Sequence, residues 1–227
     1  MHIANPQETA NWRGTPSKFI VLYNHCSNMD PPVVMAGTPV PLRFIAKKQL
    51  ALVPFVGWSF WWCGVRYINR KKHDSAIKVL DTAANDMKNW RFNYALAPEG
   101  TRRRSGKTED LLPFKKGAFH MAMDTGATIV PACIIGNDDL MGPGAKWPAR
   151  GKVTIRFMPP IHVDKEKDTV DSLLERSRAS MLEGIRQGHA EFEEGWAWKE
   201  ASATLLFTYM GVMAAIAGVC VARSALS

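Results

Sequence analysis

Short apolar runs of strand length alternate with longer amphipathic stretches along this chain. The runs are rich in β-branched and aromatic residues, which at this length favours a strand over a helix. They occupy residues 19–23, 42–46, 94–97, 129–135 and 153–158. Helices are predicted between them, near 32–36, over 74–90 and from 114 onwards. The pattern therefore indicates an α/β fold, in which helices flank a mostly parallel central sheet and ligand sites lie beyond the strand ends.

Two of the predicted helices carry an apolar stripe. In the stretch 74–90, Asp74 and Ser75 can cap the first turn, and the stripe comprises Ile77, Leu80, Ala84 and Met87. The second stripe comprises Val170, Leu173, Leu174, Met181 and Ile185. Such spacing places each set on one side of a helix. Both helices are therefore assigned a structural role.

Changes in composition divide the chain into four parts. Residues 1–17 are polar and have no basic-then-apolar signal sequence, so export is not expected. Residues 18–163 form the predicted core, and residues 164–200 form an amphipathic helical region. Residues 201–222 carry no charge, and as a helix they would extend about 33 Å, enough for a bilayer core of about 30 Å. They predict a C-terminal membrane-anchoring helix, with a core-packing or partner-binding helix as the alternative.

The stretch 50–65 is apolar and holds three of the eight tryptophans. It is too short to span a bilayer easily. Packing in the core is one interpretation. Contact with a membrane interface or an acyl chain is the other, because indole rings settle at headgroup depth and basic residues flank the segment.

The strand predicted at residues 19–23 ends abruptly at polar, protonatable side chains. If a helix begins near Pro31, the side chains of His25 and Asp30 can meet across one turn. A carboxylate on one ring nitrogen fixes the histidine tautomer, and the other nitrogen can then take a proton from a hydroxyl. The alternative is that Asp30 is an ordinary helix N-cap and His25 an ordinary residue at a strand end.

Charge is distributed unevenly along the chain. The net charge is +8, and residues 1–163 carry 22 Lys and Arg against 11 Asp and Glu. Such a body attracts anions: phosphate ligands, an anionic membrane surface or nucleic acid. The four cysteines and six histidines are scattered, so no metal site is predicted, and reduced thiols in a cytoplasmic compartment are the default.

A second polar cluster follows the strand predicted at 94–97. The sequence Pro-Glu-Gly-Thr-Arg-Arg-Arg-Ser-Gly-Lys occupies residues 98–107. Its cations and its glycines, which free the backbone, are suited to cradling an anion.

Taken together, these pieces resemble the glycerolipid acyltransferases of the lysophosphatidic acid type. Residues 24–30 look like the first family block, the His-x-x-x-x-Asp motif, and residues 64–70 like the second, with Asn69 where Asp is common. Residues 98–102 are similar to the third block and residues 130–131 to the fourth. The segments 46–50 and 114–117 also match, with Gln49 where Glu is usual. Family members often place hydrophobic helices before the first block, and here that stretch is polar.

The resemblance implies transfer of a fatty acyl group from acyl-coenzyme A or acyl carrier protein to the free hydroxyl of lysophosphatidic acid, in phospholipid biosynthesis. His25 would be the general base and Asp30 its orienter. The acceptor phosphate would be held by Arg70, Glu99, Gly100, Thr101 and Arg102. Further substrate contacts would come from Asn24, Lys48, Arg66, Lys115 and Pro131.

Partners and location follow from the same resemblance together with the basic charge. We expect no cofactor beyond the acyl donor, no nucleic acid, and attachment to an anionic membrane surface with the catalytic domain on the cytoplasmic side. Another lyso-acceptor, such as a lyso-ornithine lipid or another lysophospholipid, is the alternative substrate. A non-catalytic, basic protein that binds anionic lipid is the rival of another class, although electrostatic binding requires no carboxylate beside a histidine.

Overall fold

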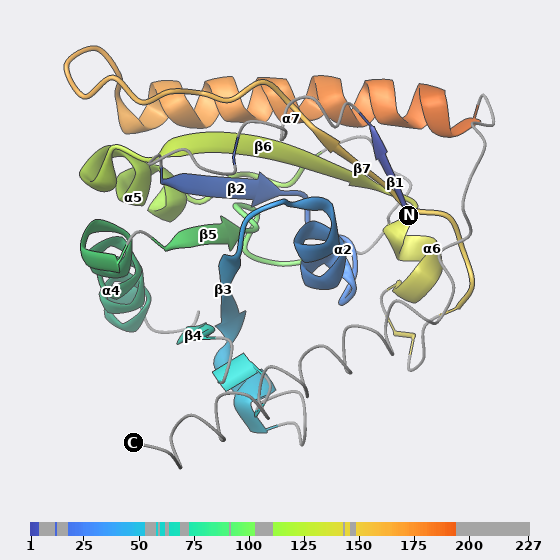
Figure 1. The fold of residues 1–227 in the computed structure, drawn as a ribbon, viewed down its shortest axis with the longest axis horizontal. Coiled ribbons are helices and arrows are strands. Elements are labelled where there is room, and N and C mark those ends of the chain that lie inside the picture. Colours follow the sequence, from blue (N-terminus) through green and yellow to red (C-terminus); the bar gives the residue numbers. More distant parts are fainter. Residues whose placement is uncertain are drawn as a thin grey trace.

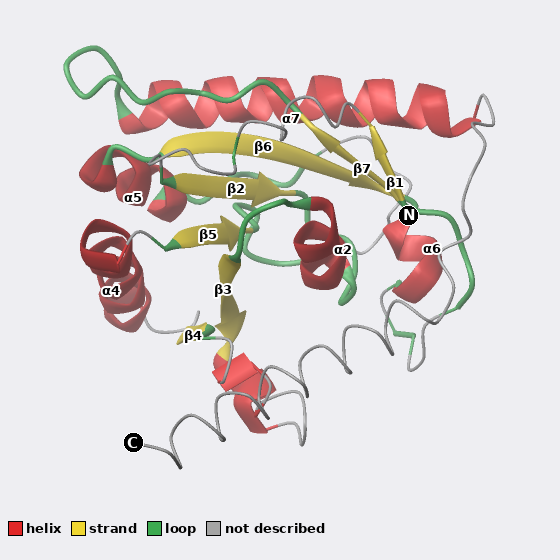
Figure 2. Cartoon of the chain, in the orientation of Figure 1, coloured by secondary structure: helices red, strands yellow, loops and turns green. Residues whose placement is uncertain are grey.

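The computed structural model describes residues 1–4, 12, 18–52, 58, 60–61, 64–68, 73–90, 92–102, 111–142, 144–145 and 149–193. Its strands are β1 (His2–Ala4), β2 (Phe19–Tyr23), β3 (Leu42–Lys47), β4 (Arg66–Ile68), β5 (Asn93–Leu96), β6 (Thr128–Ile135) and β7 (Thr154–Phe157). Its helices are α2 (Asp30–Gly37), the 3-10 helix η1 (Lys48–Leu52), α4 (His73–Trp90), α5 (Gly117–Thr125), α6 (Asn137–Met141) and α7 (Val170–Glu193). Figure 2 shows these elements by type.

The strands form one sheet in the order β1-β7-β6-β2-β5-β3-β4 (Figure 1). Strands β6, β2, β5, β3 and β4 run parallel to one another. Strand β7 is antiparallel to β6, and β1 pairs parallel with β7. The mostly parallel sheet predicted from the alternation of strands and helices is thus confirmed.

Strand β2 lies between β5 and β6, and this position determines where the polar loops meet. Ile20 aligns with Tyr94 of β5 and with Ile129 of β6. Because the three strands are parallel, their carboxyl ends share one edge of the sheet. The loops that begin after Tyr23, Leu96 and Ile135 therefore start side by side at that edge, where open α/β sheets bind ligands.

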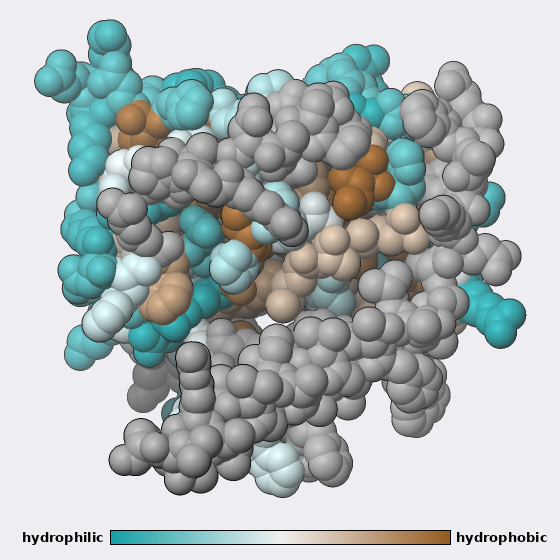
Figure 3. Space-filling view, in the orientation of Figure 1, coloured by the Kyte–Doolittle hydropathy of each residue, from teal (hydrophilic) through white to brown (hydrophobic). Residues whose placement is uncertain are grey.

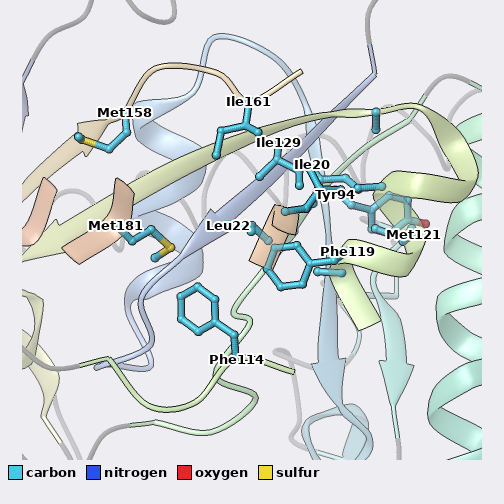
Figure 4. Close-up of a cluster of buried hydrophobic side chains, with 14 of the residues drawn as sticks. Ile20, Leu22, Tyr94, Phe114, Phe119, Met121, Ile129, Met158, Ile161 and Met181 are labelled. Atoms are coloured by element: carbon cyan, nitrogen blue, oxygen red, sulfur yellow. The ribbon is translucent and has the colours of Figure 1, made fainter. Parts of the chain in front are cut away.

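Both faces of β2 are covered, so all five of its residues are buried. Ile20 and Leu22 join a cluster that includes residues from α4, α5 and α7, and Figure 4 shows their side chains turned towards Phe114 and Phe119. Val21 and Tyr23 join a second cluster on the other face, with residues from α2 and α6. Successive residues of a strand point to opposite faces of the sheet. Because both faces of β2 are covered, every residue of the run 19–23 is apolar.

Helix α7 follows its predicted stripe, because Leu173, Met181 and Ile185 are buried against the sheet. Helix α4 follows its stripe only in part. Ala84 and Met87 are buried, whereas Ile77 is 44% exposed. The prediction for Ile77 was wrong because the early turns of α4 extend past the core. In Figure 3 the edge of the molecule near α4 is mostly hydrophilic.

The fold includes residues that lie ahead of the predicted core boundary at Lys18. Strand β1 extends the sheet at its β7 edge, and the Trp12 ring stacks on Phe19 at 5.0 Å and meets the edge of Phe157 at 5.5 Å. A three-residue strand is too short to produce a periodic pattern. These residues therefore pack with the sheet although they lie ahead of Lys18.

Four of the exposed large apolar side chains among the described residues come from one short stretch. Leu50, Leu52, Trp58 and Trp61 reach solvent, Leu52 with 83% of its surface. No helix in the described part of the chain is long and apolar enough to cross a membrane. Residues 201–222, for which an anchor was predicted, lie outside the described residues.

A partly buried ionic cluster joins β3, β4, α4 and β5. The Asp86 carboxylate accepts two-pronged hydrogen bonds from Arg66 at 2.8–3.0 Å and one from the Tyr94 hydroxyl at 2.7 Å. Arg43 lies 3.4 Å from the same carboxylate and over the Phe92 ring. Burial alone would raise the pKa of Asp86. The hydrogen bonds from Tyr94 and Arg66 and the charges of both arginines outweigh burial, so the pKa lies below its ordinary value of 3.8.

We expect Asp86→Asn to reduce the free energy of unfolding at pH 7 by about 1–3 kcal/mol, because the buried carboxylate loses the charge that binds Arg66 and Arg43. Since the pKa of Asp86 is lower in the folded state, this contribution is full above the unfolded-state pKa and is lost as the pH falls through the folded-state pKa. Urea unfolding should therefore show a wild-type advantage that shrinks below about pH 4.

Asp124→Asn is the matched control, because Asp124 is half exposed in its ion pair with Lys88. Such a pair contributes about 0–1 kcal/mol. An equal loss in the two variants would mean that the Asp86 cluster is no more than a surface pair.

Candidate active site

The His25 imidazole and the Asp30 carboxylate lie in contact at the carboxyl edge of the sheet. His25 follows β2 in a short loop, and Asp30 opens α2, in which Pro31 and Pro32 occupy the first turn. The distance from His25 Nδ1 to Asp30 Oδ2 is 2.7 Å. Met29, not Asp30, is the N-cap residue, so the carboxylate turns back towards the loop instead of capping the helix.

The Asp30 carboxylate is fully buried and is surrounded by donors. Besides the imidazole, it accepts the backbone N–H groups of Cys26 at 2.9 Å and Ser27 at 3.0–3.1 Å. The Cys26 thiol lies 3.5 Å away, and the side-chain amide of Asn137 donates to Oδ1 at 2.6 Å. Donors that converge in this way hold a carboxylate in one orientation and offset the cost of burying it.

Two further contacts fix the loop that carries His25. Asn24 forms a pair of hydrogen bonds with the backbone of Ile134 in β6, at 2.7 and 2.8 Å, and is buried. Glu99 is 2% exposed, and its carboxylate accepts the backbone N–H of His25 at 2.9 Å and that of Leu112 at 3.0 Å. Both side chains therefore face the protein, and the geometry favours a supporting role over contact with a substrate.

Gly100 turns the chain beside this loop. Its φ of +69° is one that residues with side chains rarely adopt. A Cβ at this position would lie 2.8–3.0 Å from the outer atoms of the Lys115 side chain, so Lys115 crosses directly over the turn. Neither Lys115 nor Arg102 forms an ion pair within the described part of the chain, whereas the neighbouring Lys116 pairs with Asp171 at 2.6 Å. Thr101 is exposed at the same turn.

The remaining predicted contact residues are divided between surface and interior. Lys48 is exposed where η1 begins at the end of β3. Arg66 is hydrogen-bonded to Asp86, and this hydrogen bond raises the pKa of Arg66 above its ordinary value. Pro131 lies buried inside β6. Arg70 lies outside the described residues.

Pro131 occupies a gap in the β6 ladder. The pairing with β7 begins at Ala132, and the next contact on that side is the bridge between Ile129 and Ile161. Between them the Pro131 carbonyl accepts the N–H of Met158 at 2.8 Å. A residue without an N–H is tolerated at such a break, and Pro131 acts on the site through the course of β6.

Asn137 is the site residue that sequence reasoning missed. It is 107 positions from Asp30 in the chain. A single asparagine after a strand is common in proteins, so it did not mark this position as part of a site. Only the parallel arrangement of β2 and β6 shows that the two residues share one edge. Among the described residues, no group of three or more His, Cys, Asp or Glu side chains could hold a metal ion.

A family profile described as Acyltransferase matches residues 7–135. The 1-acyl-sn-glycerol-3-phosphate acyltransferase alpha of Ovis aries is 32% identical over 170 residues, which cover 74% of this chain and 58% of that relative. The corresponding enzyme of Escherichia coli K12 is 32% identical over 184 residues, which cover 81% of this chain and 71% of that relative. The chain thus spans less than two thirds of the length of the sheep relative.

A solved structure shares the fold. The 1-acyl-sn-glycerophosphate (LPA) acyltransferase PlsC of Thermotoga maritima superimposes with a TM-score of 0.69 at 26% identity. The match covers 87% of this chain and 73% of that one. The likeness therefore extends over most of the sheet and its helices.

Proposed function

This chain belongs to the acyltransferase family, and we propose that it moves a fatty acyl group from a thioester donor to the free hydroxyl of lysophosphatidic acid, making phosphatidic acid. The donor would be acyl-coenzyme A or acyl carrier protein, and no bound cofactor is needed. The observation that carries the proposal is the 2.7 Å contact between His25 and the buried Asp30 at the carboxyl edge of the sheet. The names of the relatives support the same acceptor.

The contact determines which nitrogen of His25 acts as the base. A carboxylate only accepts hydrogen bonds, so the proton of the neutral ring lies on Nδ1, and Nε2 keeps its lone pair. The imidazole is partly exposed, with 16% of its side-chain surface accessible, whereas Asp30 is sealed behind it. Nε2 can therefore reach a substrate hydroxyl that Asp30 cannot.

The reaction then proceeds by direct attack. Nε2 takes the proton of the acceptor hydroxyl as that oxygen attacks the thioester carbonyl carbon. The new C–O bond forms, the C–S bond breaks, and the leaving thiolate takes the proton from the imidazolium and departs as a thiol. Asp30 stabilises the imidazolium between the two proton transfers. No acyl-enzyme is formed.

The acceptor phosphate would bind at the Gly100 turn. Arg102 and Lys115 lie at this turn without a carboxylate partner in the described residues, and Gly100 lets the backbone approach closely. A guanidinium can pair with two phosphate oxygens, whereas an ammonium provides a point charge. Arg70 would add a second guanidinium, as the family resemblance implies.

We also propose that the protein works at the cytoplasmic face of a membrane. Leu50, Leu52, Trp58 and Trp61 are exposed, and Lys47 and Lys48 are exposed just ahead of them. Apolar and indole side chains beside lysines suit an anionic lipid surface. This stretch follows β3, whose carboxyl end lies at the same edge of the sheet as His25. The anchor predicted at 201–222 would act together with it.

We expect His25→Ala to abolish acyl transfer and Asp30→Asn to lower kcat by at least about 100-fold, because the base is removed in one and loses its orienting carboxylate in the other. Radiolabelled transfer to lysophosphatidic acid measures both, and circular dichroism checks folding. Cys26→Ala should lose no more than a few-fold. Wild-type turnover in either His25→Ala or Asp30→Asn would rule out base catalysis by this pair.

We expect Arg102→Lys and Lys115→Ala each to reduce kcat/KM on lysophosphatidic acid by about tenfold, equivalent to about 1.4 kcal/mol. On an uncharged monoacylglycerol at equal donor the loss should be much smaller. Lys116→Ala is the matched control, because it removes the same charge from the adjacent residue, which is paired with Asp171. Equal losses on both acceptors would assign these cations to the donor or to the fold.

We expect a chain that ends at Lys199 to move from the membrane fraction towards the soluble one and to keep a residual binding that falls as salt rises. Leu52→Glu in that shortened chain should remove the residual binding to vesicles that contain phosphatidylglycerol. Trp90→Glu is the control, because Trp90 is 71% exposed at the far end of α4. Binding that survives both the truncation and Leu52→Glu would place the attachment elsewhere.

A further inference from the structure

The turn from β6 into α6 delivers an amide to the buried carboxylate of the site. Asn137 is fully buried, and its Nδ2 lies 2.6 Å from Asp30 Oδ1. Gly136 makes the turn at a φ of +78°, and a Cβ there would lie 2.5 Å from the Lys152 carbonyl oxygen and 2.7 Å from the Phe192 ring. The Lys152 carbonyl and the Phe192 ring thus pack closely against the backbone of Gly136. This packing fixes the position of Asn137.

The orientation of the amide has one physical solution. If the amide were flipped, Asn137 Oδ1 would face the Asp30 carboxylate, and two acceptors would oppose each other. With Nδ2 towards Asp30, Oδ1 is buried and has no hydrogen-bond partner. A buried polar atom without a partner is unfavourable, so a residue with packing as its sole task would not need this amide. The polar side-chain atom of Asn137 that forms a hydrogen bond is the donor nitrogen, Nδ2.

The Asn137 amide binds Oδ1 of Asp30, the carboxylate oxygen that His25 does not contact. The imidazole donates to Oδ2. On Oδ1 the amide lies at 2.6 Å and the Ser27 N–H at 3.1 Å, so the amide is the closer of the two and restrains rotation of the carboxylate about χ2. Rotation of the carboxylate would carry Asp30 Oδ2 away from His25 Nδ1. The tautomer with its proton on Nδ1 would then no longer be favoured. The amide therefore acts on the base through the carboxylate.

We propose that Asn137 is a positioning residue for acyl transfer: it holds Asp30 so that His25 keeps its proton on Nδ1 and presents Nε2 to the acceptor hydroxyl. This inference rests on the proposed function. It does not place Asn137 in contact with either substrate. Its loss should therefore lower kcat and leave KM nearly unchanged.

Ser27 provides a matched control for a purely structural role. Its hydroxyl donates to the Met141 carbonyl at 2.8 Å and accepts the Met29 N–H at 3.0 Å, so it ties the same loop to the other end of α6 and to the start of α2. Its side chain does not contact the Asp30 carboxylate, which it serves only through its backbone N–H. Ser27→Ala thus weakens the contact between the loop and α6 without removing a donor from Asp30.

The experiment compares Asn137→Ala, Asn137→Asp and Ser27→Ala in the full chain by acyl-transfer kinetics and thermal unfolding. We expect Asn137→Ala to lower kcat at least about tenfold with KM within about twofold, because misplacement of a catalytic group is costly. Asn137→Asp keeps the shape of the side chain but opposes two carboxylates, so it should be at least as damaging. Ser27→Ala should lose no more than about threefold. Equal kcat losses in Asn137→Ala and Ser27→Ala, or a mild Asn137→Asp, would overturn the proposal.

A spectroscopic measurement keeps the test independent of activity. The Nδ1 proton of His25, hydrogen-bonded to a carboxylate, gives a downfield proton resonance that Asp30→Asn removes and thereby assigns. Asn137→Ala should shift or broaden this signal, and Ser27→Ala should leave it in place. An unchanged signal in Asn137→Ala would contradict the positioning role even if turnover fell. Full activity of His25→Ala would contradict the proposed function. If Asn137→Ala still shifted the His25 signal in a protein that keeps His25, the effect of Asn137 on the geometry of His25 and Asp30 would nevertheless be supported.

Discussion

A carboxylate that is sealed from solvent must be surrounded by donors, and this requirement at Asp30 organises the edge of the sheet. Burying an unpaired charge is unfavourable, whereas burying an apolar group is favourable. The donors come from the loop after β2, through its backbone and the His25 ring, and from the residue after β6. They can converge only if β2 and β6 are adjacent and parallel, as they are. The order of the strands and the chemistry of the loop are thus two aspects of one constraint.

The cations of this basic chain fall into two groups, which differ in their partners. Arg43 and Arg66 form ion pairs with Asp86 and join the β3–β4 corner to α4. Arg102 and Lys115 lie at the Gly100 turn, outside any ion pair of the described residues. The first pair shares the carboxylate of Asp86 within the protein, whereas the second has no carboxylate partner among the described residues. A count of charges along the chain cannot tell these two groups apart, because the distinction lies in which carboxylates the fold brings beside them.

What could be predicted from the sequence is mostly what is local in it. The run 19–23 and the stripe of α7 carry their periods within one element, and His25 and Asp30 are only five positions apart. The supports of the site are not local: Glu99 is 74 positions from His25, and Asn137 is 107 from Asp30. Their roles depend on strand order, which no spacing reveals. For the same reason the hydrogen bonds that Asn24, Glu99 and Arg66 form within the protein could not be foreseen from their spacing.

The fourth block of the family pattern lies in β6, the strand that leads to one of these supports. Pro131 draws attention because a proline inside a strand is unusual, but it is buried in β6 at the point where the ladder with β7 is interrupted. The ladder resumes at Ala132 and sets the course of the last residues of β6. Those residues include Ile134, which binds Asn24, and they lead through Gly136 to Asn137. The block therefore lies in the strand that brings Asn137, six positions beyond the proline, to the Asp30 carboxylate.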